Sequence, residues 1–143
     1  STVRVWDSQS LRCVATLRGH TDNVRSLASV PGKFVLSGSW DKTIRVWDCK
    51  SWHEVACLRG HSEATLALAV RPRDGVVFSG SFDCSVRLWS LDTFRCIKVF
   101  NIHADAVRVL ETEDGDDDDD EGQHCYSGGY DGSICGLRVS DQH

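Results

Sequence analysis

The sequence of 143 residues contains no Met and only two Pro. It has no apolar run close to the roughly 18 residues that a membrane-spanning helix requires, and its first residues, STVRVWD, lack the layout of a signal peptide. Seven Cys are present without a CxxC pair, which favours reduced thiols over a disulfide scaffold. These absences predict an intracellular protein, cytoplasmic or nuclear, with no membrane contact. Because Ser1 falls within a repeated pattern, we also expect a longer chain.

The net charge of −5 is concentrated in one place, since nine of the 21 acidic residues lie between Glu111 and Glu121. A run of this kind repels itself, so we expect a solvated loop. Contact with a basic partner is one alternative. A calcium site that uses Asp114, Asp116 and Asp118 is another, although Asp119 stands where an EF-hand requires Gly. No Cys and His spacing is typical of zinc, and the scattered basic residues form no clear nucleic-acid surface. We therefore expect no metal and no cofactor.

The dominant feature is an internal repeat of about 41 residues, marked by His20, His61 and His103. Three segments align without gaps: SGSWDKTIRVWD, SGSFDCSVRLWS and SGGYDGSICGLR. Each repeat contains four short runs rich in apolar residues with turn residues between them, and no stretch has a helical period. The sequence therefore predicts an all-β fold of four-stranded antiparallel units.

Units of this length with Gly-His and Trp-Asp marks resemble the blades of the WD-repeat (WD40) β-propeller family. The resemblance covers the chain apart from the acidic tract. It implies an incomplete arc of about three and a quarter four-stranded antiparallel blades. Residues 1–18 would end a preceding blade, and WD repeats would occupy 19–59, 60–101 and 102–143, the last with an acidic insertion at 111–122. The remaining blades would come from a longer chain or from self-association.

The resemblance also implies a hydrogen-bonded set of His, Ser, Asp and Trp within each blade. The matching residues are His20, Ser37, Asp41 and Trp47; His61, Ser79, Asp83 and Trp89; and His103, Ser127 and Asp131, with Leu137 in place of the Trp. Because buried polar groups need partners and the same trio recurs in every blade, we interpret these sets as structural and not catalytic. The sequence has no phosphate-binding loop and no nucleophile elbow, so we do not expect an enzyme.

Superposition of the repeats places an aromatic residue before each turn Asp: Trp40, Phe82 and Tyr130. Arg25 and Arg108 share one position of the first strand, and strand alternation would direct both toward the same rim as the aromatic residues. In the resembled family this rim surrounds the central channel, and there the arginines would donate charge-assisted hydrogen bonds while the aromatic rings make apolar or cation–π contacts. Packing of the rings on a neighbouring blade is the alternative.

The predicted function is that of a protein–protein interaction scaffold, which presents this propeller face to peptide or protein partners. Two alternatives remain open. One is the substrate-receptor part of a ubiquitin ligase, since the F-box/WD-repeat type holds short, often phosphorylated, peptides on this rim. The other is a structural subunit of a large multiprotein assembly, which would use the blade sides and the opposite face.

Overall fold

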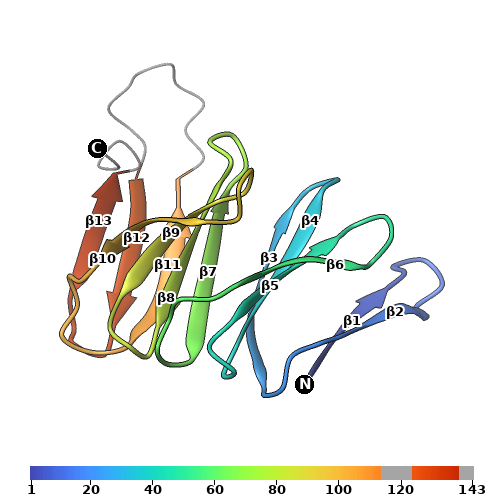
Figure 1. Ribbon diagram of the computed structural model, residues 1–143, viewed down its shortest axis with the longest axis horizontal. Helices are drawn as coiled ribbons and strands as arrows, with labels where there is room; N and C mark the ends of the chain where they lie inside the picture. The colour runs from blue at the N-terminus through green and yellow to red at the C-terminus, as the bar shows by residue number, and fades with distance from the viewer. Residues whose placement is uncertain (114–123, 139–143) are drawn as a thin grey trace.

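The computed structural model describes residues 1–113 and 124–138, except for the side chains of His124 and Arg138. Within these ranges the chain forms antiparallel β-strands, and no helix is long and apolar enough to cross a membrane (Figure 1). Asp114, Asp116 and Asp118, on which the calcium alternative depends, lie outside the described residues.

Two complete four-stranded sheets form the middle of the molecule. Sheet 1 contains β3 (Val24–Val30), β4 (Phe34–Ser39), β5 (Ile44–Asp48) and β6 (Glu54–Leu58), each paired with the next. The predicted four-stranded antiparallel unit is therefore present. Sheet 2 repeats this order with the four strands that follow along the chain: β7 (Thr65–Arg71), β8 (Val76–Ser81), β9 (Val86–Ser90) and β10 (Cys96–Phe100).

Among the described residues, the sheets at the two ends have fewer strands. Sheet 3 contains β11 (Val107–Thr112), β12 (His124–Gly129) and β13 (Ile134–Arg138), and the N-terminal sheet contains β1 (Thr2–Trp6) and β2 (Cys13–Arg18). In order of sequence, the sheets stack as an open arc (Figure 1). The arc is not closed, as predicted.

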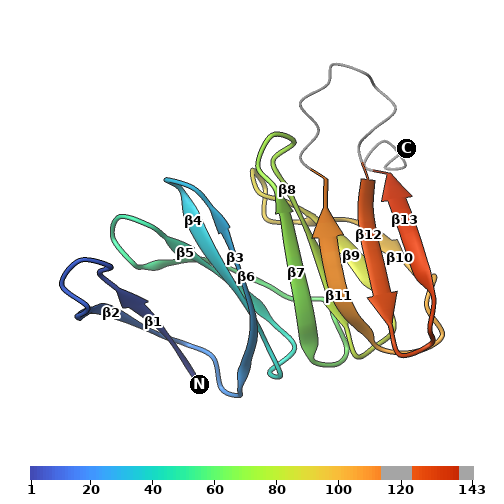
Figure 2. The same cartoon turned by 180° about the vertical axis from the view of Figure 1, so that it is seen from behind.

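The first strands β3, β7 and β11 lie side by side along the inner edge of the arc (Figure 2). All three begin at the same end of the molecule, which also holds the turns that follow β4, β8 and β12. The end of β11 and the start of β12, which flank the acidic tract, lie at the opposite end. The inner strands therefore bring equivalent residues of three repeats to one rim.

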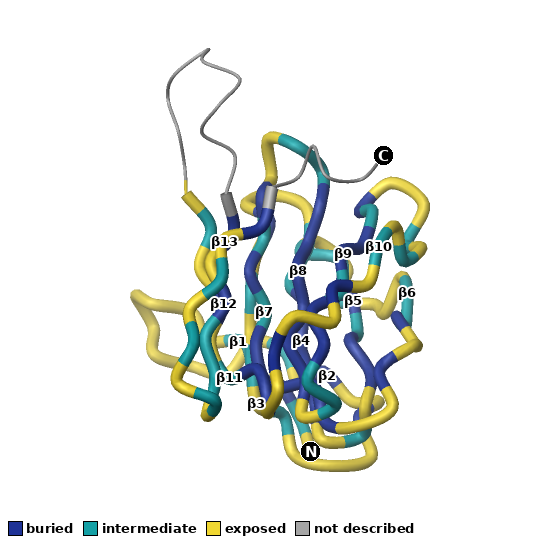
Figure 3. The backbone as a smooth tube through the Cα atoms, turned by 90° about the vertical axis from the view of Figure 1, so that its left-hand side faces the viewer, coloured by how far each residue is buried: buried dark blue, intermediate teal, exposed yellow. Residues whose placement is uncertain are grey.

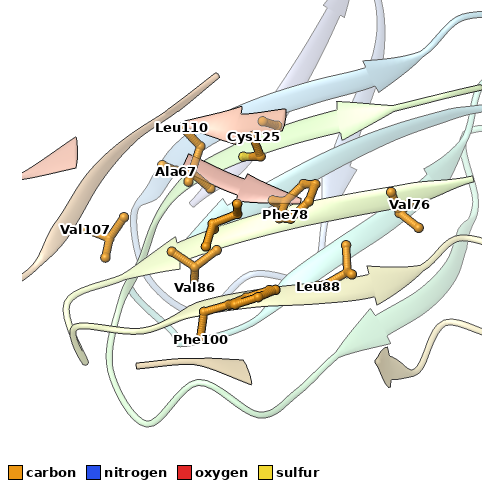
Figure 4. Packing of buried hydrophobic residues seen from close by; sticks show 11 residues of the cluster. Ala67, Val76, Phe78, Val86, Leu88, Phe100, Val107, Leu110 and Cys125 are labelled. Atoms are coloured by element: carbon orange, nitrogen blue, oxygen red, sulfur yellow. The ribbon is translucent and has the colours of Figure 1, made fainter. Parts of the chain in front are cut away.

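Alternating apolar side chains pack each sheet on the next. Between sheets 2 and 3, Phe78, Val86 and Leu88 contact Val107 and Cys125 in one buried cluster (Figure 4). A second cluster joins sheets 1 and 2 in the same way. Burial of these side chains contributes about 1.5–3 kcal/mol for each large residue. The stacking makes the relative positions of the inner strands rigid.

The inner edges of the sheets approach closely at glycines. A Cβ atom on Gly80 would lie 2.7 Å from Val107 Cγ1 of the next sheet, and one on Gly38 would lie 2.9 Å from Thr65 Cγ2. A Cβ atom could not lie this close to another carbon atom unless one of the two moved. Because glycine has no Cβ atom, the neighbouring sheets can approach closely here.

The outward faces of the arc are less buried than its interior (Figure 3). Ile44 and Val86 are fully buried by the following sheet, whereas the equivalent Ile134 of sheet 3 is 81% exposed. On the first strands, Leu68 packs in the core between sheets 1 and 2, but the equivalent Leu27 is 58% exposed because the N-terminal sheet has only two strands.

Candidate functional site

A chain of polar contacts connects the loop before β3 to the turn after β4. His20 Nδ1 lies 2.7 Å from Asp41 Oδ2, and His20 Nε2 lies 2.7 Å from Ser37 Oγ. The indole N–H of Trp47 donates to Ser37 Oγ at 2.9 Å. Because an ionised carboxylate only accepts hydrogen bonds, a neutral imidazole carries its proton on Nδ1 and accepts from the Ser hydroxyl at Nε2. The structure thus brings all four predicted residues together.

Sheet 2 repeats this arrangement. His61 lies 2.9 Å from Asp83 Oδ2 and 2.6 Å from Ser79 Oγ, and Trp89 donates to the same Ser hydroxyl at 2.8 Å.

Sheet 3 has the same contacts without the indole. His103 lies 3.0 Å from Asp131 Oδ2 and 2.7 Å from Ser127 Oγ. Leu137 occupies the Trp position and is buried in the core between sheets 2 and 3. Ser127 also lies within 3.5 Å of the Cys135 carbonyl. The third set therefore has one donor fewer than the other two.

Each turn Asp also binds a hydroxyl group that the sequence reasoning missed. Thr43 Oγ1 donates to Asp41 Oδ1 at 2.6 Å, and Ser85 Oγ donates to Asp83 Oδ1 at 2.6 Å. Ser133 is the equivalent residue in sheet 3. The available signal was a hydroxyl residue two positions after the turn Asp in every repeat.

These contacts change the acidity of the turn carboxyls. Burial acts to raise the pKa of Asp41, but hydrogen bonds from Thr43 and His20 outweigh burial and lower that pKa to about 2. Burial also acts to raise the pKa of Asp83, and donation by His61 is the largest of the effects that hold it below its ordinary value. The carboxylates are therefore ionised at neutral pH and fix the turns to the loops.

In sheets 1 and 2, the Ser, His and Asp residues resemble a catalytic triad in composition but not in accessibility. Ser37 and Ser79 are fully buried, and the oxygen of each is occupied by an indole donor. A nucleophile must reach its substrate, and these hydroxyl groups cannot.

The turns present aromatic rings at the rim of the arc. Trp40, Phe82 and Tyr130 are 47%, 51% and 66% exposed. The backbone N–H of Trp40 donates to the Asn23 carbonyl at 2.9 Å, and that of Phe82 donates to the Ala64 carbonyl at the same distance. These bonds hold two of the aromatic turns against the loops that begin the inner strands.

A β-bulge lies at the start of each inner strand. The pairing register shifts between Val24 and Ser26, and at the equivalent points of β7 and β11, so the extra residues are Arg25, Leu66 and Arg108. A bulge redirects a side chain that strict alternation would place elsewhere. Strict alternation predicts that both arginines point toward the rim, whereas the structure places each of them at an interruption of the alternation.

The three bulge residues have different surroundings. Arg25 is exposed and lines an open hollow together with Trp40. Arg108 is half-buried, with its guanidinium 4.8 Å from the centre of the Tyr130 ring. Leu66 lies between them and packs with Ala64 and Ala106 in a small buried cluster. We define the rim surface as Arg25, Trp40, Phe82, Arg108 and Tyr130.

The described residues do not gather metal-ligating side chains at one place. They contain no cluster of three or more His, Cys, Asp or Glu side chains arranged to hold a metal ion. All seven Cys are free thiols, and burial raises the pKa of Cys125 to about 12. Cys13 is exposed in the N-terminal sheet, whereas the equivalent Cys96 is half-buried.

A family model described as WD40, "WD domain, G-beta repeat", matches residues 11–48 and 52–90, which together form just over half of the chain. Each match begins near the outermost strand of one sheet and ends at the third strand of the next. The matched segments therefore cross the contacts between sheets 1 and 2 and between sheet 1 and the N-terminal sheet.

Among curated proteins, the mitochondrial division protein 1 of Neurospora crassa is 48% identical over 42 residues, which cover 29% of this chain and 6% of the relative. The structure of U3-55K superposes with a TM-score of 0.84 at 25% identity, covering 99% of this chain and 44% of that protein. The computationally designed Ika4 protein superposes with a TM-score of 0.83 at 27% identity, covering 96% of this chain and 79% of the design. This chain spans a small part of the curated relative and less than half of U3-55K.

Proposed function

This chain belongs to the WD40 repeat family, and we propose that it is a non-catalytic interaction module that binds a peptide or protein partner through the rim surface. WD40 repeats generally mediate protein–protein interaction, and the family is one of binding modules without catalytic activity. The observation that carries the proposal is the position of three half-exposed aromatic side chains on equivalent turns of adjacent sheets.

Physical arguments favour the rim surface over the outer strands. Aromatic and Arg side chains contribute much of the binding energy at protein interfaces. The aromatic turns are held by backbone hydrogen bonds and by the buried His and Asp contacts below them. A rigid surface loses little conformational entropy when it binds. The rim surface therefore carries side chains that suit protein binding, and its turns are already held in place before a partner binds.

The test is to compare the partners that the full-length protein retains in cells with and without the aromatic residues. A variant carrying Trp40→Ala, Phe82→Ala and Tyr130→Ala should remain folded, because all three side chains are exposed on turns. We expect it to lose at least one partner by tenfold or more, measured by quantitative mass spectrometry after affinity capture. Near-ultraviolet circular dichroism checks that the sheets still pack.

The matched control removes exposed apolar side chains away from the rim surface. Val55 and Ile97 lie on the outermost strands β6 and β10 and are 44% and 39% exposed. A variant with Val55→Ala and Ile97→Ala should retain the partners of the wild-type protein. Two results would contradict the proposed function: the control variant loses the same partners, or the aromatic variant retains all of them.

A further inference from the structure

Three equivalent turns hold a large apolar side chain in a backbone conformation that such residues rarely adopt. Leu11, Trp52 and Phe94 have φ angles of 58°, 58° and 56°, and they lie in the turns β1–β2, β5–β6 and β9–β10. In each turn, the N–H of this residue donates at 2.9 Å to the carbonyl four residues earlier. A left-handed conformation of this kind persists where surrounding contacts stabilise it.

Two of these residues obtain such contacts from the preceding sheet. Trp52 packs with Trp47 against Val3 of the N-terminal sheet. Phe94 packs in the cluster between sheets 1 and 2, where its ring centre lies 5.8 Å from that of Phe34 in an edge-to-face arrangement. The left-handed turn therefore anchors each of these sheets to the one before it.

Leu11 has the same backbone conformation without this covering. Its side chain is 76% exposed, and Trp6, the equivalent of the buried Trp47, is 58% exposed. Because the equivalent residues of sheets 1 and 2 pack on the preceding sheet, Leu11 and Trp6 are shaped to pack on the face of another sheet. We define the N-terminal face as Trp6 and Leu11.

Sheet 3 presents a hollowed apolar face at the other end of the arc. Val109, Tyr126 and Ile134 line a hollow of about 620 Å³, and we define these three residues as the open face of sheet 3. The equivalents of Ile134, which are Ile44 and Val86, pack against the following sheet. The open face thus occupies the position of a contact between sheets.

A glycine leaves additional room beside this hollow. Gly136 stands where sheets 1 and 2 have Val46 and Leu88, which are fully buried. A Cβ atom on Gly136 would have no atom closer than 3.7 Å, in the ring of Tyr126. The open face of sheet 3 can therefore receive a large side chain such as that of Trp6.

The two ends of the sequence also carry opposite charge. Residues 1–18, which contain the N-terminal sheet, include three Arg and one Asp. Residues 107–138, which contain sheet 3, include ten acidic residues and two Arg. Opposite charges attract the N-terminal end of one molecule to sheet 3 of another, and like charges oppose the pairing of two equal ends.

We propose that the N-terminal face of one copy of this chain packs on the open face of sheet 3 of a second copy. The contact continues the stacking of sheets within one molecule, where Trp47 packs on Val3. Between two copies, the equivalent contact joins Trp6 to Ile134. Because the two faces differ, the pairing is head-to-tail, and each pair keeps one free face of each kind. The inference does not rest on the proposed function.

The test uses two variants of the 143-residue chain, each of which alters one face. The first carries Trp6→Ser and Leu11→Gly, and Gly suits the left-handed turn. The second carries Val109→Lys and Ile134→Lys, at exposed positions of sheet 3. In sedimentation velocity, we expect the dissociation constant for self-association of each variant alone to be about tenfold or more above that of the wild-type chain.

A mixture of the two variants is the decisive measurement. Each variant retains the face that the other lacks, so an equimolar mixture should form pairs with the affinity of the wild-type chain. The pair should have about twice the monomer mass of 15.9 kDa and should not grow further, because both remaining faces are altered. Recovery of pairing in the mixture also shows that both variants are folded.

The control and a milder pair of variants complete the test. Val55→Ser removes an exposed apolar side chain from the outermost strand β6, and this variant should associate as the wild-type chain does. The single changes Leu11→Gly and Ile134→Ser allow the same mixing measurement with the smallest alteration of each face.

Three outcomes would overturn the inference. If the first variant associates as strongly as the wild-type chain, sheet 3 pairs without the N-terminal face. If the mixture stays monomeric although each variant unfolds cooperatively on heating, the two faces do not bind one another. If the wild-type chain itself stays monomeric, the open face of sheet 3 belongs to another occupant, such as a further sheet of a longer chain.

Discussion

At the scale of single residues, the turn Asp side chains connect the rim to the core. Asp41 accepts hydrogen bonds from the imidazole of His20, from the hydroxyl and N–H of Thr43, and from the N–H of Thr21. Hydrogen bonds to a charged group contribute about 1.5–3 kcal/mol each when well formed. The position of Trp40 at the rim therefore depends on the ionised state of its neighbour.

The stability of sheet 1 should consequently decrease as the solution becomes more acidic. The pKa of Asp41 falls from its ordinary value of 3.8 to about 2 on folding. A lowered pKa gives a contribution that is complete above about pH 3.8 and is lost as the pH falls through about 2. Thermal unfolding followed by circular dichroism between pH 6 and 2 should show this loss. The Asp41→Asn variant should be less stable than the wild-type protein at pH 6, and its stability should change less between pH 6 and 2. If the unfolding temperatures of the two proteins fall in parallel with pH, Asp41 is not the source of the acid sensitivity.

The residues of the hydrogen-bonded sets could be predicted because the repeat marks them three times. The way in which sheet 3 accommodates a larger residue at the Gly position could not be predicted. A Cβ atom on Gly60 would lie 2.8 Å from Arg87 Nη1 and 3.1 Å from Trp89 Cη2. The third repeat has Ile102 at the Gly position, and Cys135 and Leu137 at the other two. The smaller side chains of Cys135 and Leu137 leave room for Ile102. This relation depends on the short distances around Gly60, which the sequence does not give.

At the scale of strands and sheets, the apolar runs and the phased turns predicted four short antiparallel strands in each repeat. Sheets 1 and 2 each contain these four strands. The direction of individual side chains was less predictable, because the bulge at Arg25 changes which face a residue occupies. A bulge depends on pairing with a neighbouring strand, and this information is absent from the local pattern. The stacking of Arg108 on Tyr130 is likewise a contact between β11 and the turn after β12, which spacing alone does not give.

The approach of neighbouring sheets should be sensitive to one methyl group at the inner edge. Gly80→Ala would place Cβ 2.7 Å from Val107 Cγ1 and 3.3 Å from the Val107 carbonyl oxygen. Overpacking of this kind typically lowers the free energy of unfolding by about 1–3 kcal/mol. Gly136→Ala is the matched control, because its Cβ would have no atom closer than 3.7 Å. Urea denaturation should separate the two variants, and equal midpoints would show that sheet 3 shifts to accommodate the methyl group.

At the scale of the whole molecule, the described residues form an arc with two unlike ends. The family prediction and the incomplete propeller fold are confirmed by the matched repeats and by the superposition on U3-55K. The outward face of sheet 3 exposes Val109 and Ile134, whereas equivalent residues of sheets 1 and 2 are covered. Within residues 1–113 and 124–138, no strand pairs with the outer edge of β13, whereas β5 and β9 each pair with a fourth strand. Apolar faces and unpaired edges of this kind promote association.

The isolated chain of 143 residues should therefore associate in a concentration-dependent manner. Multi-angle light scattering should give a mass above the monomer value of 15.9 kDa at high micromolar concentration. Val109→Lys with Ile134→Lys should shift the mass toward the monomer, because charged side chains oppose burial of the face. Ile97→Lys, on the outermost strand of sheet 2, is the control and should not change the mass. A wild-type chain that remains monomeric at every concentration would show that the open face of sheet 3 is tolerated in water. A discrete oligomer that persists on dilution would instead indicate that the arc closes by self-association, and not by further blades of a longer chain.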